Sequence, residues 1–354
     1  MSKTINVIIS INSDLSLPMR KFICFLVIIA GLSTDAFAQK TIVYPTIGEI
    51  HREATFFDKI IPPDAKIEVL ASGFQWSEGP VWIKEGAYLV FSDVPQNTIF
   101  KWKEGEGIST FMKPSGYTGI AAYSNEPGSN GLTLHPNGQL VMCEHGDRRI
   151  SILDWNGGKR TLTDNFEGRR FNSPNDAVYN KDGDLYFTDP PYGLPKQQND
   201  PGREMDYAGV FRLSKNGKTT LLTNEMTFPN GIAFSPDEKT LYVAQSDAKA
   251  AIWKAFPVLK DGSLGKGKIF YDATASVGKK KGMPDGMKLD KDGNIFATGP
   301  GGIIVFSPDG KVLGTISPGE NPSNVAWGDD GSVLYFTVDM YLCRIKTSTL
   351  GDGW

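Results

Sequence analysis

The sequence has few of the residues that usually form zinc or redox centres. Cysteine and histidine occur only three times each in 354 residues. No Cys-x-x-Cys pair is present, and the histidines His51, His135 and His145 are too scattered for a zinc triad. Cys143 and Cys343 fall in predicted strands, so we expect two buried thiols rather than a disulfide.

An excess of positive charge is also lacking. The formal net charge is −3, and the only basic run is Lys279–Lys281, which we interpret as a solvated loop. Nucleic-acid partners usually require a basic face, so none is expected. The chain contains no G-x-S-x-G motif and no glycine-rich phosphate-binding loop before a helix, which argues against a serine nucleophile and against a nucleotide site.

No apolar run is long enough to span a membrane. The longest one near the start, Phe22–Leu32, follows Met19-Arg20-Lys21 and precedes Ala36-Phe37-Ala38. A span needs about 20 apolar residues, whereas a basic start, a short apolar run and a small-x-small site are typical of a secretory signal peptide. We therefore predict a signal peptide over residues 1–38, with Met19 as an alternative start. The mature protein would be periplasmic or secreted, without a membrane span.

Glycine and proline, in contrast, are plentiful, with 39 and 22 residues. Frequent turns favour many short strands over long helices. The stretch from Asn175 to Leu222 illustrates the pattern, because alternating segments are separated by the turns at Asn180–Gly183 and Asn216-Gly217. It predicts four antiparallel strands, at Asn175–Tyr179, Asp184–Asp189, Gly209–Leu213 and Lys218–Leu222.

This unit recurs along the chain. Each copy starts with one polar residue, and in four copies a turn glycine follows eight positions later. The spacings of 52, 45, 55, 55 and 39 residues match the length of a four-stranded propeller blade. The six polar residues are Glu78, Asn130, Asn175, Asn230, Asp285 and Asn324.

The repeats predict an all-β protein, a six-bladed β-propeller. Only three strands fit after Asn324, while Ala65–Gly73 is a strand without a blade. We therefore expect the N-terminal strand to complete the last blade and close the ring, which protects the sheet edges. The predicted propeller covers residues 65–354, and residues 39–64 form an N-terminal extension.

The six polar residues predict a cation site. The first strand of every blade starts near the same end of the central channel, so their side-chain oxygens should converge there. Two carboxylates in one confined site repel each other unless a cation is present. Calcium accepts six to eight oxygens with flexible geometry and is our first choice, with magnesium, manganese or zinc as alternatives. The competing interpretation is that each Asn or Asp only caps a turn.

Four motifs resemble the senescence marker protein/gluconolactonase/luciferin-regenerating-enzyme-like family of six-bladed propellers. They are SEGPVW (77–82), SPNDAVYNKDGDLYFTDPPYG (173–193), FPNGIAFSPDEKTLYV (228–243) and MPDGMKLDKDGNIF (283–296), within a resemblance that covers about residues 40–350. The resemblance implies a metal-dependent hydrolase of sugar lactones. It implies that the metal is held by Glu78, Asn175, Asn230 and Asp285, and that the substrate site involves Asn130, His145, Arg149, Tyr192 and Asn324.

The resemblance also implies a mechanism. A metal-polarised lactone carbonyl would be attacked by water, with Asp285 as the base that removes the proton from the water. Because a metal-bound carboxylate is a weak base, His145 could assist, although a structural role for His145 is an alternative. Two other functions stay open at this point: a hydrolase of another ester or phosphoester, and a non-catalytic propeller that binds a sugar or a protein partner.

Overall fold

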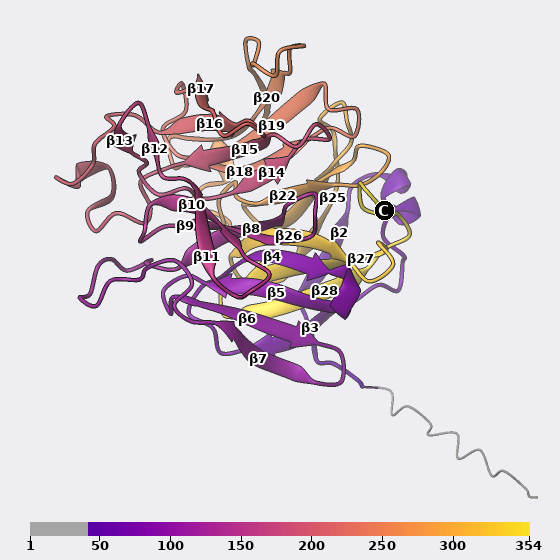
Figure 1. Ribbon diagram of the computed structural model, residues 1–354. Helices are drawn as coiled ribbons and strands as arrows, with labels where there is room; N and C mark the ends of the chain where they lie inside the picture. Colours follow the sequence, from indigo (N-terminus) through magenta and orange to yellow (C-terminus); the bar gives the residue numbers. More distant parts are fainter. Residues whose placement is uncertain (1–41) are drawn as a thin grey trace, which may run out of the picture. The chain divides into compact units, whose positions relative to one another are not determined.

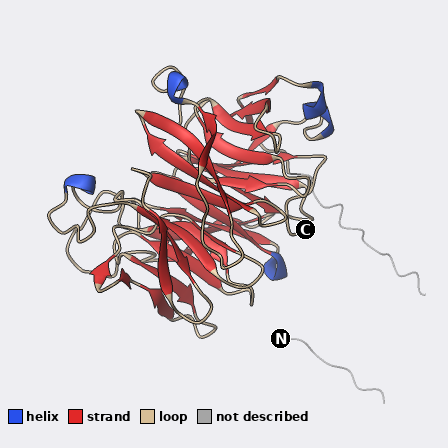
Figure 2. Cartoon of the chain, turned by 90° about the horizontal axis from the view of Figure 1, so that it is seen from above, coloured by secondary structure: helices blue, strands red, loops and turns tan. Residues whose placement is uncertain are grey.

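The computed structural model describes the unit of residues 42–354. The predicted signal peptide, residues 1–38, lies outside the described residues. Strands make up nearly all the regular structure of this unit, and four short 3-10 turns lie in its connections. Figure 2 shows these turns at the periphery of the sheets.

Six sheets form the predicted six-bladed propeller. The first three blades are consecutive four-stranded meanders. Blade 1 contains β4 (Ser77–Ile83), β5 (Tyr88–Asp93), β6 (Thr98–Lys103) and β7 (Gly107–Met112). Blade 2 contains β8 (Ser129–Leu134), β9 (Leu140–Glu144), β10 (Arg149–Leu153) and β11 (Lys159–Thr163). Blade 3 contains β14 (Ala177–Tyr179), β15 (Leu185–Asp189), β16 (Gly209–Leu213) and β17 (Thr219–Thr223).

The remaining blades follow the same order, and a small hairpin, β12 (Asn165–Phe166) with β13 (Arg169–Arg170), precedes blade 3. Blade 4 contains β18 (Pro229–Phe234), β19 (Thr240–Asp247), β20 (Ala250–Pro257) and β21 (Lys268–Asp272). Blade 5 contains β22 (Met287–Leu289), β23 (Ile295–Gly299), β24 (Gly302–Phe306) and β25 (Val312–Ser317). Blade 6 contains β26 (Pro322–Gly328), β27 (Val333–Val338) and β28 (Tyr341–Lys346).

The ring closes as predicted. Strand β3 (Ile67–Ser72) pairs antiparallel with β28 and supplies the fourth strand of blade 6 (Figure 1). A short strand, β1 (Thr46–Ile47), adds to the outer edge of β3. Because the first and last parts of the chain share one sheet, neither end of the ring leaves an unpaired inner strand.

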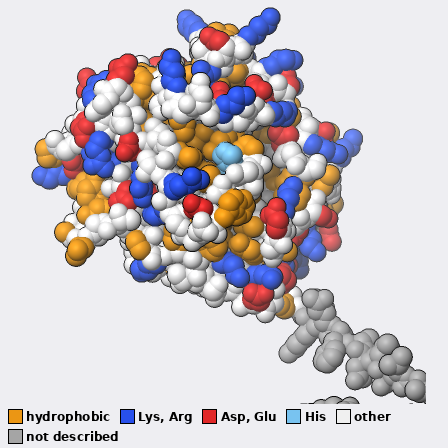
Figure 3. Space-filling model, in the orientation of Figure 1, with side chains coloured by type: hydrophobic (Ala, Val, Ile, Leu, Met, Phe, Trp, Pro, Cys, Tyr) orange, Lys and Arg blue, Asp and Glu red, His pale blue; other side chains and the backbone are white. Residues whose placement is uncertain are grey.

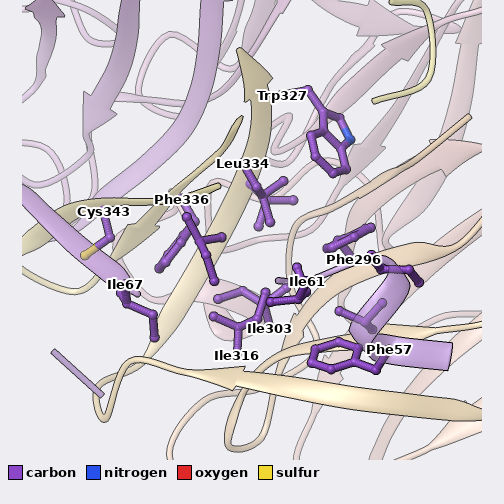
Figure 4. Packing of buried hydrophobic residues seen from close by; sticks show 14 of the residues in the cluster. Phe57, Ile61, Ile67, Phe296, Ile303, Ile316, Trp327, Leu334, Phe336 and Cys343 are labelled. Carbon is purple, nitrogen blue, oxygen red and sulfur yellow. The ribbon is translucent and has the colours of Figure 1, made fainter. Parts of the chain in front are cut away.

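The segment expected as an N-terminal extension contributes to two blades. Its strand β2 (Glu49–Arg52) pairs with β25 of blade 5. The turn η1 (Thr55–Lys59) then inserts Phe57, with Ile61 after it, into a core shared with residues of blades 5 and 6 such as Phe296 (Figure 4). The sequence did not predict β1 and β2, because strands this short show no clear alternation of apolar and polar residues.

The two cysteines of the described residues are buried and free. This agrees with the expectation of two separate thiols in strands, since Cys143 lies in β9 and Cys343 in β28.

Candidate active site and cation site

The first strands of successive blades lie side by side around the ring, in the order β4, β8, β14, β18, β22 and β26. At one end of this ring they enclose a cavity of about 260 Å³. The structure brings five of the six predicted polar residues to its wall: Glu78, Asn130, Asn175, Asn230 and Asp285. The sixth, Asn324, lies against Glu78, to which its amide Nδ2 donates a hydrogen bond of 3.2 Å.

Glycines allow the first strands to approach so closely. A Cβ on Gly79 would lie 2.2 Å from the carbonyl oxygen of Asn130, and one on Gly231 would lie 2.1 Å from that of Asp285. A Cβ on Gly286 would lie 2.0 Å from the side chain of Asn324. Each glycine follows a site residue in the sequence, so the polar-Gly pair places one side chain in the cavity and makes room for the next blade.

Hydroxyl groups fix the backbone of the site residues between blades. The Ser92 hydroxyl donates to the carbonyl oxygen of Asn130 at 2.9 Å, and the Thr188 hydroxyl donates to that of Asn230 at 2.8 Å. Both donors are buried in the second strand of the preceding blade. The positions of the two asparagines are therefore set by the neighbouring blade as well as by their own.

The Asn230 amide is oriented by a hydroxyl. Its Nδ2 donates to Ser246 Oγ at 3.0 Å, and Ser246 Oγ in turn donates to the carbonyl oxygen of Pro284. Since the single hydroxyl proton is used on Pro284, Ser246 must accept from Asn230, which leaves the amide oxygen of Asn230 available. The amide oxygen of Asn175 is buried and has no hydrogen-bond partner within the described part of the chain, residues 42–354. Buried polar atoms are rarely left unpaired in proteins, so this oxygen indicates a ligand.

Ionisation of the carboxyl groups in the cavity is unfavourable. Burial raises the pKa of Glu78 to about 8, with a further contribution from the negative charge of Asp176. The pKa of Asp285 is raised well above its usual range by loss of hydration and by the charge of Glu78. A bound cation would remove both penalties, because it favours the ionised forms.

The donor set fits a divalent cation that prefers oxygen. It combines the two carboxylates with amide oxygens on Asn175 and Asn230, all of which line one cavity. In residues 42–354 no group of three or more His, Cys, Asp or Glu side chains is placed to hold a metal ion. A cation here would therefore depend on the two amides as much as on the two acids, which is the ligand type of calcium.

A third buried carboxylate, Asp176, was not predicted as a site residue. Its side chain is 2% exposed, and one of its oxygens has no partner. It follows Asn175 at the position where four other blades have glycine, and this substitution was the sequence signal that could have identified it. Loss of hydration raises its pKa, and the positive charge of Lys288 opposes that rise.

The predicted substrate residue Tyr192 lines the cavity and stacks on Phe228, with the ring centroids 5.8 Å apart. Its hydroxyl is buried without a hydrogen-bond partner. Other wall residues were missed, because they follow no repeat position that the sequence could mark. They are Trp76, Glu126, Ser246, Gly282, Met283, Asn321 and Pro322.

His145 lies behind the cavity wall. It is fully buried, neither ring nitrogen has a hydrogen-bond partner, and Nδ1 is 3.8 Å from the Glu126 carboxylate. Burial lowers the pKa of the imidazole to about 4, so the ring is neutral near pH 7. His145 does not line the cavity itself but lies against one of the wall residues, Glu126.

Arg149 is placed away from the cavity wall. Its Nε donates to Glu144 Oε2 at 2.7 Å, and its other nitrogens contact Thr161 and Asp147. Each of these contacts is made within blade 2 or the turn before β10. The guanidinium therefore neutralises a buried acid of its own blade, and the structure does not bring it together with the other predicted substrate residues.

On the face drawn in Figure 3, acidic and basic side chains are interspersed. Within residues 42–354, no helix is both long enough and apolar enough to cross a membrane.

Residues 76–339 match the family described as SMP-30/gluconolactonase/LRE-like region. The chain belongs to this family. It is 42% identical to a gluconolactonase of Zymomonas mobilis over 318 residues, which cover 86% of this chain and 88% of that protein. The solved structure of a gluconolactonase from Xanthomonas campestris superimposes with a TM-score of 0.74 and 29% identity, over 87% of this chain and 99% of that one.

A more distant relative is a diisopropyl-fluorophosphatase of Loligo vulgaris, which is 24% identical and covers 74% of this chain and 85% of its own length. Together these comparisons confirm the predicted family and a gluconolactonase-like lactone hydrolase on a β-propeller.

Proposed function

We propose that the protein is an exported, metal-dependent hydrolase that opens sugar lactones. The observation that carries the proposal is the Asn175 amide oxygen, which is buried without a partner in a cavity that also contains Glu78 and Asp285. Carboxylate and amide oxygens that converge on one cavity suit a divalent cation, and calcium is our first choice. Such an ion would act as a Lewis acid on a carbonyl group.

The protein side chains would supply the rest of the chemistry. Asp285 is the residue we assign as the base that takes the proton from the attacking water, because it lines the cavity beside the other ligands. Tyr192 and Trp76 would offer apolar faces to a ring, while Asn130 could donate and accept hydrogen bonds with the substrate. His145 is assigned a positioning role behind Glu126, and Arg149 a role in blade 2.

Export rests on the sequence of the first 38 residues. Arg20 and Lys21, the apolar run and Ala36-Phe37-Ala38 have the order of a signal peptide. Expression of the full chain followed by N-terminal sequencing of the exported protein tests this point, and we expect the mature chain to begin at Gln39.

Turnover tests the activity. The protein is treated with a chelator, dialysed, and assayed by proton release on D-glucono-δ-lactone with and without added Ca²⁺, Mg²⁺, Mn²⁺ or Zn²⁺. We expect loss of the rate above spontaneous opening and its recovery with calcium. If chelation leaves the hydrolysis rate unchanged, the proposed metal dependence is wrong. If the protein hydrolyses no lactone of a panel faster than the spontaneous rate, the proposed substrate class is wrong.

A second candidate is a hydrolase of phosphoesters or of other esters at the same cavity. It is favoured by the relative that is a diisopropyl-fluorophosphatase. Aryl esters and organophosphates in the same panel separate the two candidates by kcat/KM.

A further inference from the structure

Glu126 has no role in the proposed cation site, although its carboxylate opens on the same cavity. Its side chain is 37% exposed and belongs to the cavity wall. Among the residues that the structure describes, no lysine or arginine lies within 4.0 Å of its carboxylate, and the nearby His145 imidazole, 3.8 Å away, is neutral near pH 7. Burial raises the pKa of Glu126 to about 7, so its carboxyl group is partly ionised near neutral pH, and a ligand that hydrogen-bonds to the ionised form would favour that form.

The backbone next to Glu126 is firmly held. The Gly128 N–H donates to the carbonyl oxygen of Val94 at 2.9 Å, and the carbonyl oxygen of Gly128 accepts from the His145 N–H at 3.1 Å. A Cβ on Gly128 would lie 2.5 Å from the Val94 oxygen, so the segment fits tightly against blade 1. The Glu126 carboxylate is thus presented from a fixed support.

The side that faces away from the cavity is closed by His145. The imidazole is fully buried, and a Cβ on Gly193 would lie 2.4 Å from the His145 Cβ, which shows how closely the next blade packs. The carboxylate cannot retreat into this space. The carboxylate therefore lies between His145 and the cavity, where a ligand can reach it.

The chemistry of the wall indicates the type of ligand. Both forms of the Glu126 carboxyl group have acceptor oxygens, and in the ionised form its two oxygens can accept hydrogen bonds from two neighbouring hydroxyl groups. Trp76 and Tyr192 line the same cavity and provide apolar surface for the faces of a small ring. The volume of about 260 Å³ is below the roughly 300–1,000 Å³ of sites for drug-sized ligands, which favours a single ring.

We propose that Glu126 binds hydroxyl groups of the substrate and thereby selects polyhydroxylated lactones over unsubstituted ones. This inference rests on the proposed function and adds a specificity-determining residue to it. Glu126 contributes binding that is equal in the ground state and the transition state. Its loss should therefore raise KM and leave kcat nearly unchanged.

The experiment compares wild type, Glu126→Ala and Glu126→Gln on D-glucono-δ-lactone and on δ-valerolactone, which has no hydroxyl groups. We expect Glu126→Ala to raise KM for gluconolactone at least 10-fold with kcat within about threefold, since hydrogen bonds to a charged group are among the stronger ones. Glu126→Gln keeps one acceptor oxygen and should give a smaller rise. The kcat/KM for δ-valerolactone should stay the same or increase.

Glu85→Ala is the matched control, because Glu85 is a surface acid of blade 1 outside the cavity. Calcium affinity is measured by calorimetry for each variant and should not change. A fall in kcat with unchanged KM would indicate that Glu126 acts as a base, and a loss of calcium affinity would indicate that it is a cation ligand. Wild-type kinetics in Glu126→Ala would show that it has no role in substrate binding. Each of these results overturns the inference. A wild type that opens no lactone would instead overturn the proposed function itself.

Discussion

The interior of blade 2 and the central cavity both bury carboxylates, but the two regions treat them differently. In blade 2, Glu144 is fully buried and accepts from Arg149 Nε at 2.7 Å and Lys159 Nζ at 2.9 Å, as well as from Ser151. In the cavity, Glu78 accepts hydrogen bonds, among residues 42–354, from the Gly79 N–H and the Asn324 amide alone.

This difference distinguishes acids that stabilise the fold, such as Glu144, from acids that are available to a ligand, such as Glu78. A buried ion pair that is fully hydrogen-bonded can be part of a stable interior, whereas an uncompensated buried charge is costly. The protein tolerates that cost at the ring centre, where a ligand could remove it. Unpaired carboxylates and amide oxygens are therefore better guides to the site than the total number of buried acids.

The largest expected effect comes from removing a cavity carboxylate. Asp285→Asn should lower kcat/KM for gluconolactone more than 1,000-fold, because both the base and a cation ligand are lost. The metal-free variant should be as stable as the metal-free wild type or about 1 kcal/mol more stable, since one of two repelling acids has been neutralised. Assay and urea denaturation in chelator measure the two quantities, and a large loss of stability would contradict the comparison.

Neutralising a buried acid of blade 2 should lower stability and leave activity unchanged, the opposite of the result expected in the cavity. Glu144→Gln leaves Arg149 and Lys159 without their acid, so we expect the free energy of unfolding to fall by about 3–5 kcal/mol. Urea denaturation of the variant and the wild type measures this loss.

Arg149→Met tests the predicted role of Arg149 in substrate binding. If Arg149 serves only blade 2, the folded variant retains the wild-type KM, whereas a rise in KM would restore its predicted place at the substrate.

His145 provides a test by pH. Burial lowers its pKa to about 4 from an ordinary 6.5, so between these values the folded protein binds fewer protons than the unfolded chain. Stability should therefore fall as the pH falls through this window, by up to about 3 kcal/mol. His145→Asn should remove this part of the pH dependence in denaturation curves. His135→Asn is the control, since His135 is not buried.

The smallest expected effect concerns the close approach of the blades. Gly231→Ala would place a Cβ 2.1 Å from the Asp285 carbonyl oxygen, so we expect a loss of about 1–3 kcal/mol in stability and weaker calcium binding. Gly158→Ala is the matched control, because a Cβ there would meet no atom within 4 Å. Equal stability of both variants would show that the strands can separate without cost.

The turn positions show how much of the fold a local sequence pattern predicts. Of the expected turn glycines, Gly138, Gly183, Gly293 and Gly331 have positive φ, whereas in blade 1 the left-handed residue is Ala87, with φ 47, and not the expected Gly86. In blade 4, where the glycine is missing, Glu238 adopts φ 55 and keeps the turn. Turn chemistry and alternation are local properties, so the six units could be predicted from the sequence. The pairing of β3 with β28 followed from the count of strands, because the last unit lacked one strand and the N-terminal strand had no blade. The short strands β1 and β2 could not be predicted, because segments of two and four residues are too short to show an alternating pattern.

The sequence by itself determined the number of blades, the closure of the ring and the repeat positions whose oxygens meet at its centre. These features follow from local periodicity and from the fixed place of each first strand. Only the tertiary structure decided which polar groups are compensated. Arg149 turned to Glu144, while Glu126 was left open to the cavity with His145 behind it. Pairing depends on distances between residues of different strands and loops, and the spacing of residues along the chain does not specify those distances.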